Sequence, residues 1–362
     1  MKKNGKIELL RFVFSICVLL LHIQKYFPGE VSLKEGIRFH FFPYGGIGVE
    51  FFFVVSGFLM AASIFNANEA QKSLPLGEAT FRFIRSKFVP LIPMRVIVFV
   101  LLLVATVRVE SWGIMTVVEK LIAYIPGFFL VQMSGFGEVY INHIEWYLSV
   151  MFIGMFIIYP FLRKNFDVFS NIVAPAVAIL VLGYMFQSFG RLSSVKSWEG
   201  LCFRSMFRGV AELLLGVTCF AACQRLAEWK PSVMGRLVFT LFELLCWGAT
   251  FTMIMLTLPR KYEFYMLTFI TLGVICAFSK VSYGSKLFDN KLSYLLGKLS
   301  LPIYLCQLIP ITVIPEYYGH LPMKQQMTMA FVSTILLALA VSGLSKLMAI
   351  GKRSRNIENQ SK

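Results

Sequence analysis

Long apolar stretches recur along the chain and are separated by short polar connections. Ten of them have about the length that an α-helix needs to cross a bilayer, roughly 20 residues. They lie at about residues 7–27, 45–66, 88–108, 145–162, 172–189, 206–223, 236–258, 263–280, 299–317 and 326–349. The pattern predicts an all-α, polytopic bundle of transmembrane helices with about ten spans.

One further apolar stretch, at residues 117–131, is short and interrupted. It contains Glu119, Lys120 and Pro126. Charges and an internal proline both disfavour a helix that crosses the bilayer. We therefore expect a short non-spanning or re-entrant segment here; if it does cross, the bundle has eleven spans.

Composition agrees with this class. Hydrophobic residues make up 57% of the 362 residues and charged residues 15%, a balance that excludes an ordinary soluble domain. We expect one integral membrane domain at residues 1–350 and a polar, disordered tail at residues 351–362. Because no small-residue cleavage site follows the first apolar stretch, we interpret it as a retained helix rather than a signal peptide.

The basic net charge is interpreted as membrane topology. Lys and Arg number 35 against 19 Asp and Glu, a formal charge of +16. With ten spans and both termini in the cytoplasm, most of these cations fall on the cytoplasmic side, which the positive-inside rule favours. Nothing resembles a nucleic-acid module, and the spacing of the four His and seven Cys suggests neither a metal site nor a disulfide.

The first apolar stretch carries ionisable residues at membrane depth. Arg11 and His22 lie eleven positions apart, a spacing that returns to nearly the same helix face, and Glu8 and Ser15 fall on the same stripe. Such groups normally face a bundle interior or a watery cavity, and they mark a pathway or reaction site. The alternative is that Arg11 reaches to the membrane interface and His22 is a packing residue.

The direction of the first two helices places His22 and Glu50 at matching depth, near the outer surface. A carboxylate that faces an imidazole fixes its tautomer and raises its basicity, which a general base near neutral pH requires. A purely structural ion pair is the alternative. Close helix approach in this region is expected at four glycines, namely Gly45, Gly46, Gly48 and Gly57.

The main basic loop, FRFIRSKFVPLIPMR, follows the second helix on the predicted cytoplasmic side. It carries Arg82, Arg85, Lys87 and Arg95. Such a cluster can hold phosphates through charge-assisted contacts. It can equally anchor the topology or bind anionic lipid head groups, and the residues alone favour the anchor.

Five runs together resemble the acyltransferase-3 family of integral membrane acyltransferases. ELLRFVFSICVLLLH is similar to its Arg-x10-His signature, GIGVEFFFVVSGFLM to its second-helix motif and RSKFVPLIP to its proline-closed basic stretch. EWYLSVMFIGMFIIYP resembles its Trp-aromatic-Leu-Ser helix start, and LLGKLSLPIYLCQ its late Gly-x-x-Ser…Tyr-Leu motif. The matching positions in the last three are Arg85, Lys87, Pro90, Trp146, Ser149, Gly297, Ser300 and Tyr304. Glu50 stands where Asp is commoner, and Gln307 where His is frequent, which leaves the role of Gln307 open.

The resemblance implies transfer of an acyl group, usually acetyl from acetyl-CoA, to a hydroxyl of an envelope carbohydrate or lipid-linked glycan at a bacterial inner membrane. Acyl-CoA is then a substrate, with no permanently bound cofactor, and the oligomeric state stays open. His22 and Glu50 are the expected catalytic residues. The expected donor-binding residues are Arg11, Ser15, Arg85 and Lys87, and the candidates for acceptor binding are His40, His143, Glu145 and Trp146.

Direct transfer and an acetyl-histidine intermediate both fit this arrangement. Two other classes also have buried charges and many spans. A transporter or flippase of an anionic or glycan-linked substrate is one, although no internal repeat supports it. A non-catalytic scaffold or receptor is the other, and the set of Arg11, His22 and Glu50 argues against it. Acyl transfer from acetyl-CoA by the purified protein separates these classes.

Overall fold

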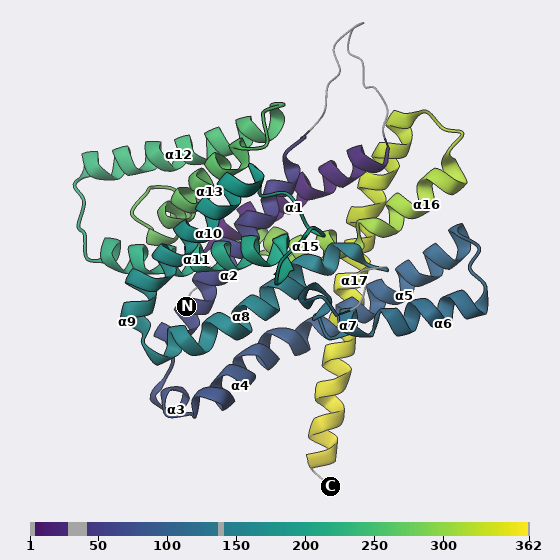
Figure 1. The fold of residues 1–362 in the computed structure, drawn as a ribbon, viewed down its shortest axis with the longest axis horizontal. Coiled ribbons are helices and arrows are strands. Elements are labelled where there is room, and N and C mark those ends of the chain that lie inside the picture. The colour runs from purple at the N-terminus through teal and green to yellow at the C-terminus, as the bar shows by residue number, and fades with distance from the viewer. Residues whose placement is uncertain (1–3, 28–41, 137–140, 361–362) are drawn as a thin grey trace, which may run out of the picture.

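The computed structural model describes residues 4–27, 42–136 and 141–360. Its long helical elements are α1 (Gly5–Tyr26), α2 (Gly48–Phe65), α4 (Leu76–Phe88), α5 (Ile92–Val109), α8 (Trp146–Lys164), α10 (Ala174–Phe189), α11 (Arg204–Ala227), α12 (Val233–Met255), α13 (Tyr262–Ser279), α15 (Lys291–Cys306), α16 (Leu308–Tyr318) and α17 (Met323–Gln360). Figure 1 shows them as one helical bundle.

Short elements connect the long helices. They are η1 (Gly45–Ile47), α3 (Glu69–Lys72), η2 (Val89–Leu91), α6 (Ile114–Ala123), α7 (Ile125–Phe128), η3 (Gln132–Ser134), η4 (His143–Glu145), α9 (Phe166–Val168), the π-helical η5 (Phe169–Val173) and α14 (Ser285–Phe288). Strands β1 (Trp198–Glu199) and β2 (Cys202–Phe203) form a two-stranded antiparallel hairpin.

The predicted bundle of about ten spans is confirmed. Within the described residues, nine helical stretches are long and apolar enough to cross a membrane, and α15 with α16, bent by 53°, makes the tenth. The segment near residues 117–131 forms α6 and α7, of 10 and 4 residues. Both are far shorter than the roughly 20 residues that a span needs, as expected.

Two local expectations were wrong. The basic loop is helical: α4 continues through η2 into α5 as one helical stretch, Leu76–Val109, which contains an apolar window long enough to span the membrane. Pro90 and Pro93 are each the second residue of their helical segments, within the first turn, where the missing N–H costs no internal hydrogen bond. Residues 351–360 of the expected tail are helical as well: α17 continues to Gln360 through Lys, Arg, Glu and Gln, which favour helix. It carries the C-terminus away from the bundle (Figure 1).

The core lies where α2 packs against α11 and α8, the three most buried spans. A Cβ atom on Gly57 would lie 2.0 Å from the Leu213 carbonyl oxygen, and one on Gly45 would lie 2.2 Å from that of Cys17. Glycine therefore allows the close approach of α2 to α11 and of η1 to α1, as the sequence predicted.

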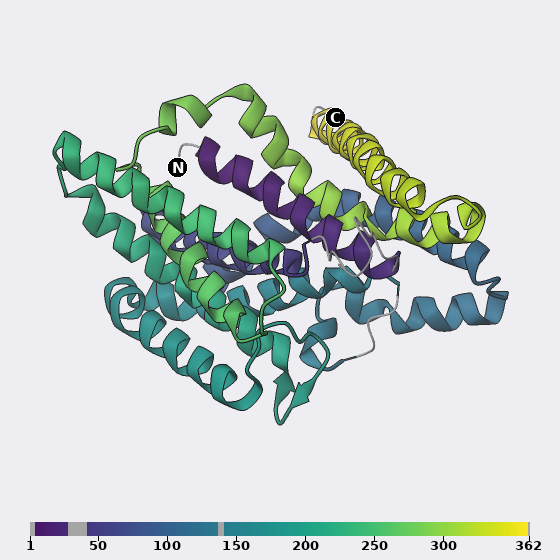
Figure 2. The same ribbon diagram turned by 90° about the horizontal axis from the view of Figure 1, so that it is seen from above.

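The first helix is surrounded by segments from the second half of the chain. It passes between α12 on one side and α14 with α15 on the other (Figure 2). Lys6 pairs with Glu243 at 2.7 Å, and Phe14 meets the Trp247 ring edge-on at 6.1 Å. This packing places the Arg11–His22 face of α1 beside residues of α15.

Candidate active site

Two cavities lie along the bundle interior and share Tyr304 as a wall. We call the first the Arg11 cavity; its volume is about 220 Å³, and Arg11, Lys87, Ser300 and apolar side chains of α2, α4 and α8 line it. The second, the His22 cavity, has a volume of about 450 Å³. Its lining includes His22, Lys25, Glu50, Trp146, Arg208, Arg260 and Glu263. One cavity is therefore largely apolar, whereas the other is rich in ionisable groups.

The tautomer of His22 is set by Gln307. The His22 Nδ1 lies 3.0 Å from the Gln307 Oε1, and the Gln307 Nε2–H donates to the Tyr304 carbonyl at 2.9 Å. The amide is thereby oriented with its oxygen toward the ring, so Nδ1 must carry the hydrogen. The lone pair is left on Nε2, and a neutral imidazole in this form can accept a proton there.

Glu50 has a different partner from the one expected. It lies at the His22 cavity, but its Oε1 pairs with the Nη2 of Arg208, not with His22. The Nε of Arg208 also contacts the Glu212 Oε1 at 3.3 Å, and the guanidinium lies over the Trp146 ring at 5.3 Å. Two buried carboxylates thus share one arginine, and one oxygen of each has no hydrogen-bond partner among the described residues.

A family model described as an acyltransferase domain matches residues 4–346. The chain belongs to the acyltransferase-3 family. It is an integral membrane acyltransferase, and the match covers both cavities and every described element from α1 to most of α17. No curated protein and no solved structure matches the chain.

The residues that the sequence predicts for donor binding separate into two groups. Arg11 and Lys87 line the Arg11 cavity, and Arg11 also pairs with Glu8 at 3.2 Å. Ser15 is fully buried and its hydroxyl donates to the Phe12 carbonyl of the same helix at 2.7 Å. Arg85 is exposed on α4 and lies outside the lining of that cavity. The structure therefore brings Arg11 and Lys87 together but not Ser15 or Arg85.

Arg95 belongs to the basic cluster in the sequence, but in the structure it pairs with Glu145. Its guanidinium donates to both carboxylate oxygens, at 3.2 and 2.8 Å, and to the carbonyls of Gly127 and Phe128. The Tyr124 hydroxyl donates to the same carboxylate at 2.8 Å. Glu145 is 1% exposed, so this placement favours a structural role: it ties α7 to the start of α8.

The other acceptor-side candidates differ in position. Trp146 lines the His22 cavity. The His143 Nε2 lies 3.3 Å from the Tyr26 hydroxyl, near the end of α1. His40 lies outside the described residues. The motif position Gly297 is explained by packing, since a Cβ there would lie 2.1 Å from the Glu8 carboxylate.

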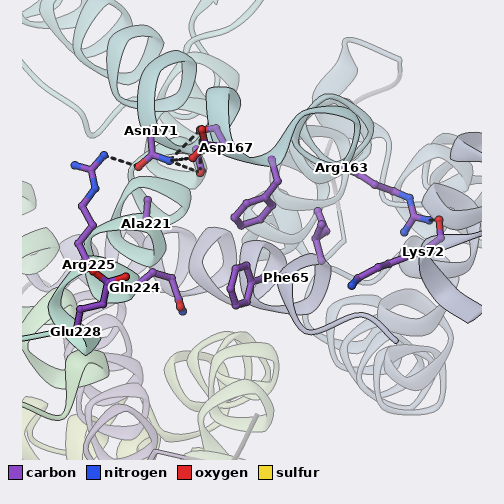
Figure 3. A pocket seen from close by; sticks show the side chains of 12 residues that line it. Phe65, Lys72, Arg163, Asp167, Asn171, Ala221, Gln224, Arg225 and Glu228 are labelled. Atoms are coloured by element: carbon purple, nitrogen blue, oxygen red, sulfur yellow. Dashed lines mark hydrogen bonds between the residues drawn. The ribbon is translucent and has the colours of Figure 1, made fainter. Parts of the chain in front are cut away.

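A larger cavity of about 640 Å³ lies elsewhere, between the ends of α2, α8 and α11. Its cations serve local structure (Figure 3): Arg163 donates to the Lys72 carbonyl at 3.1 Å, and Arg225 donates to the Asn171 Oδ1 at 2.8 Å. None of the site residues predicted from the sequence lines it. Among the described residues, no three His, Cys, Asp or Glu side chains could together hold a metal ion.

Sequence reasoning missed Arg208 and left Gln307 without a role. The signal for Arg208 was present, because an arginine with a glutamate four residues later interrupts the apolar stretch 206–223, and ionisable groups at that depth mark sites. For Gln307 no local signal exists, since its partner lies 285 positions away.

Proposed function

We propose that this acyltransferase moves an acetyl group from cytoplasmic acetyl-CoA to a hydroxyl of an envelope carbohydrate or lipid-linked glycan on the other side of the membrane. The observation that carries the proposal is the pair of cavities that meet at Tyr304. In this proposal the Arg11 cavity opens toward the cytoplasm and the His22 cavity opens outward. A hydroxyl and a thioester can then meet without either substrate crossing the membrane.

The Arg11 cavity suits the donor. Coenzyme A carries phosphates on a long, flexible pantetheine arm. Lys87 and Arg11 place two cations on a cavity whose other walls are mainly phenylalanine, leucine and methionine side chains. The cations hold the anionic end by charge-assisted contacts, and the apolar walls accept the arm with the thioester at its tip.

The His22 cavity suits the acceptor. In direct transfer, the His22 Nε2 accepts the proton of the acceptor hydroxyl as that oxygen attacks the thioester carbonyl carbon. The C–S bond then breaks, and the imidazolium returns the proton to the departing thiolate. Gln307 holds the required tautomer. Glu50, at the same cavity, offsets the transient positive charge on the ring.

The proposal is tested with purified protein in lipid nanodiscs, acetyl-CoA labelled in the acetyl group, and glycans from the envelope of the source cell. Label should enter the glycan as an alkali-labile ester. His22→Ala should reduce transfer by at least about a hundredfold, the usual contribution of a positioned general base, with unchanged gel-filtration behaviour. Transfer retained by a folded His22→Ala protein contradicts the catalytic assignment. Glycan movement without ester formation would instead identify a transporter or flippase.

The donor side has a matched pair of variants on one helix. Lys87→Ala should raise the KM for acetyl-CoA by about twofold to fivefold, the range of a solvent-accessible charge contact. The kcat should change little, because such a contact binds ground state and transition state alike. Arg85→Ala removes a cation two residues away that does not line the cavity, so its KM should stay unchanged. An unchanged KM in Lys87→Ala would reduce Lys87 to a topology anchor, like Arg85.

A further inference from the structure

Tyr304 occupies the boundary between the two halves of the proposed reaction. It is the residue that the linings of the Arg11 and His22 cavities share. Its neighbours one turn earlier on α15, Ser300 and Leu301, line the Arg11 cavity, and three residues later Gln307 contacts His22. The ring therefore lies where an acyl group would leave the donor cavity and meet the base.

The ring is fixed in this position. Tyr304 is 4% exposed, and its hydroxyl donates to the Ile144 carbonyl at 2.6 Å. Its ring and the Tyr147 ring make an edge-to-face contact, with centroids 5.9 Å apart, and Tyr147 lines the Arg11 cavity. A buried aromatic side chain with both a hydrogen bond and a ring contact is a rigid wall.

A rigid wall at this point limits what can stand in front of the base. The Arg11 cavity is small, about 220 Å³, and the pantetheine arm would occupy much of it. The space that remains for the acyl group ends at the Tyr304 ring. Each added methylene would have to displace packed side chains, which tightly packed interiors resist.

We propose that the Tyr304 ring determines which acyl groups are transferred, an inference that rests on the proposed function. The ring also keeps water of the His22 cavity away from the thioester. The carbonyl carbon of an acetyl group lies at the ring edge, within reach of the His22 cavity, whereas a longer chain would collide with the ring. The hydroxyl of Tyr304 holds the ring in place, and the ring itself provides the selectivity. Tyr304 is thus a specificity-determining residue that separates the two cavities.

The test compares acetyl-CoA with butyryl-CoA for the wild type, Tyr304→Ala and Tyr304→Phe in nanodiscs. Wild type should favour acetyl by at least about tenfold in kcat/KM, the usual discrimination of a shaped pocket against added methylenes. Tyr304→Ala should lower the acetyl-to-butyryl ratio of kcat/KM to less than about threefold. It should also raise acetyl-CoA hydrolysis in the absence of acceptor severalfold. Tyr304→Phe, which keeps the ring, should retain the wild-type ratio.

Leu301→Ala is the control, because it enlarges the Arg11 cavity without removing the shared wall. Its acetyl-CoA hydrolysis without acceptor should rise much less than that of Tyr304→Ala, because the ring shared by the two cavities remains. Tyr304→Leu replaces Tyr304→Ala if the alanine variant does not elute as a folded protein. If a folded Tyr304→Ala or Tyr304→Leu protein keeps the wild-type acetyl-to-butyryl ratio and the wild-type rate of hydrolysis, this inference is overturned. The proposed function is not affected by that result. Failure of the wild type to transfer any acyl group from a coenzyme A thioester overturns the proposed function instead.

Discussion

Arg95 and Arg208 are both buried and both pair with glutamate, yet their surroundings differ. At Arg95 one guanidinium faces one carboxylate, and both oxygens of Glu145 have donors. At Arg208 one guanidinium faces two carboxylates, and within the described part of the chain one oxygen each of Glu50 and Glu212 has no hydrogen-bond partner. The first group is enclosed by protein, whereas Glu50 and Arg208 border the His22 cavity.

Under the proposed function, this difference separates a structural charge group from one that serves the reaction. A buried ion pair whose hydrogen bonds are all satisfied holds elements together and has no capacity left for a ligand. A group with an excess carboxylate and open acceptors beside a cavity can respond to a change of charge there, such as a transient imidazolium. Burial alone did not distinguish them, since Arg95 is 5% exposed and Arg208 3%.

The largest expected effect tests the satisfied group. Glu145→Gln removes the one carboxylate that balances Arg95, so it should lower the free energy of unfolding by about 3–5 kcal/mol, the cost of breaking a buried pair. The measurement is denaturant unfolding in detergent, supported by the yield of monodisperse protein. Wild-type stability in this variant would show that Arg95 is balanced by some other group.

A smaller effect is expected at the cavity. Glu50→Gln should reduce acyl transfer by about a hundredfold, equivalent to about 2.7 kcal/mol of transition-state stabilisation, because a neutral amide cannot offset the charge on His22. Stability should fall less than in Glu145→Gln, since Glu212 remains to pair with Arg208. Rates of acetyl transfer at saturating acetyl-CoA give the answer. Full activity would assign Glu50 a structural role like that of Glu145.

Glu212→Gln is the matched control and should have the smallest effect. It makes the same chemical change but leaves one carboxylate for one arginine, so the loss of stability should be about 1 kcal/mol, the net value of one hydrogen bond. Both unfolding and transfer are measured on the same preparations. Equal destabilisation by Glu145→Gln and Glu212→Gln would remove the distinction between the two groups.

The sequence by itself determined the class of the protein, its spans and its family. Apolar length is a local property of the chain, and a helix of that length can satisfy its own backbone in a bilayer, so composition along the sequence is sufficient. The spacing of Arg11 and His22 likewise places them on one face of one helix. The family match over residues 4–346 agrees with motifs that each lie within one short run.

The tertiary structure decided which side chains meet. His22 contacts Gln307 and not Glu50. Glu50 pairs with Arg208 instead. Arg95, which lies among basic residues in the sequence, pairs with Glu145. Each of these contacts joins residues from different elements of the bundle. Successive residues of a helix point about 100° apart, so a small rotation or shift of one helix against another changes the pairing completely. Hydropathy along the chain does not encode that rotation, which is set only when all the helices pack together.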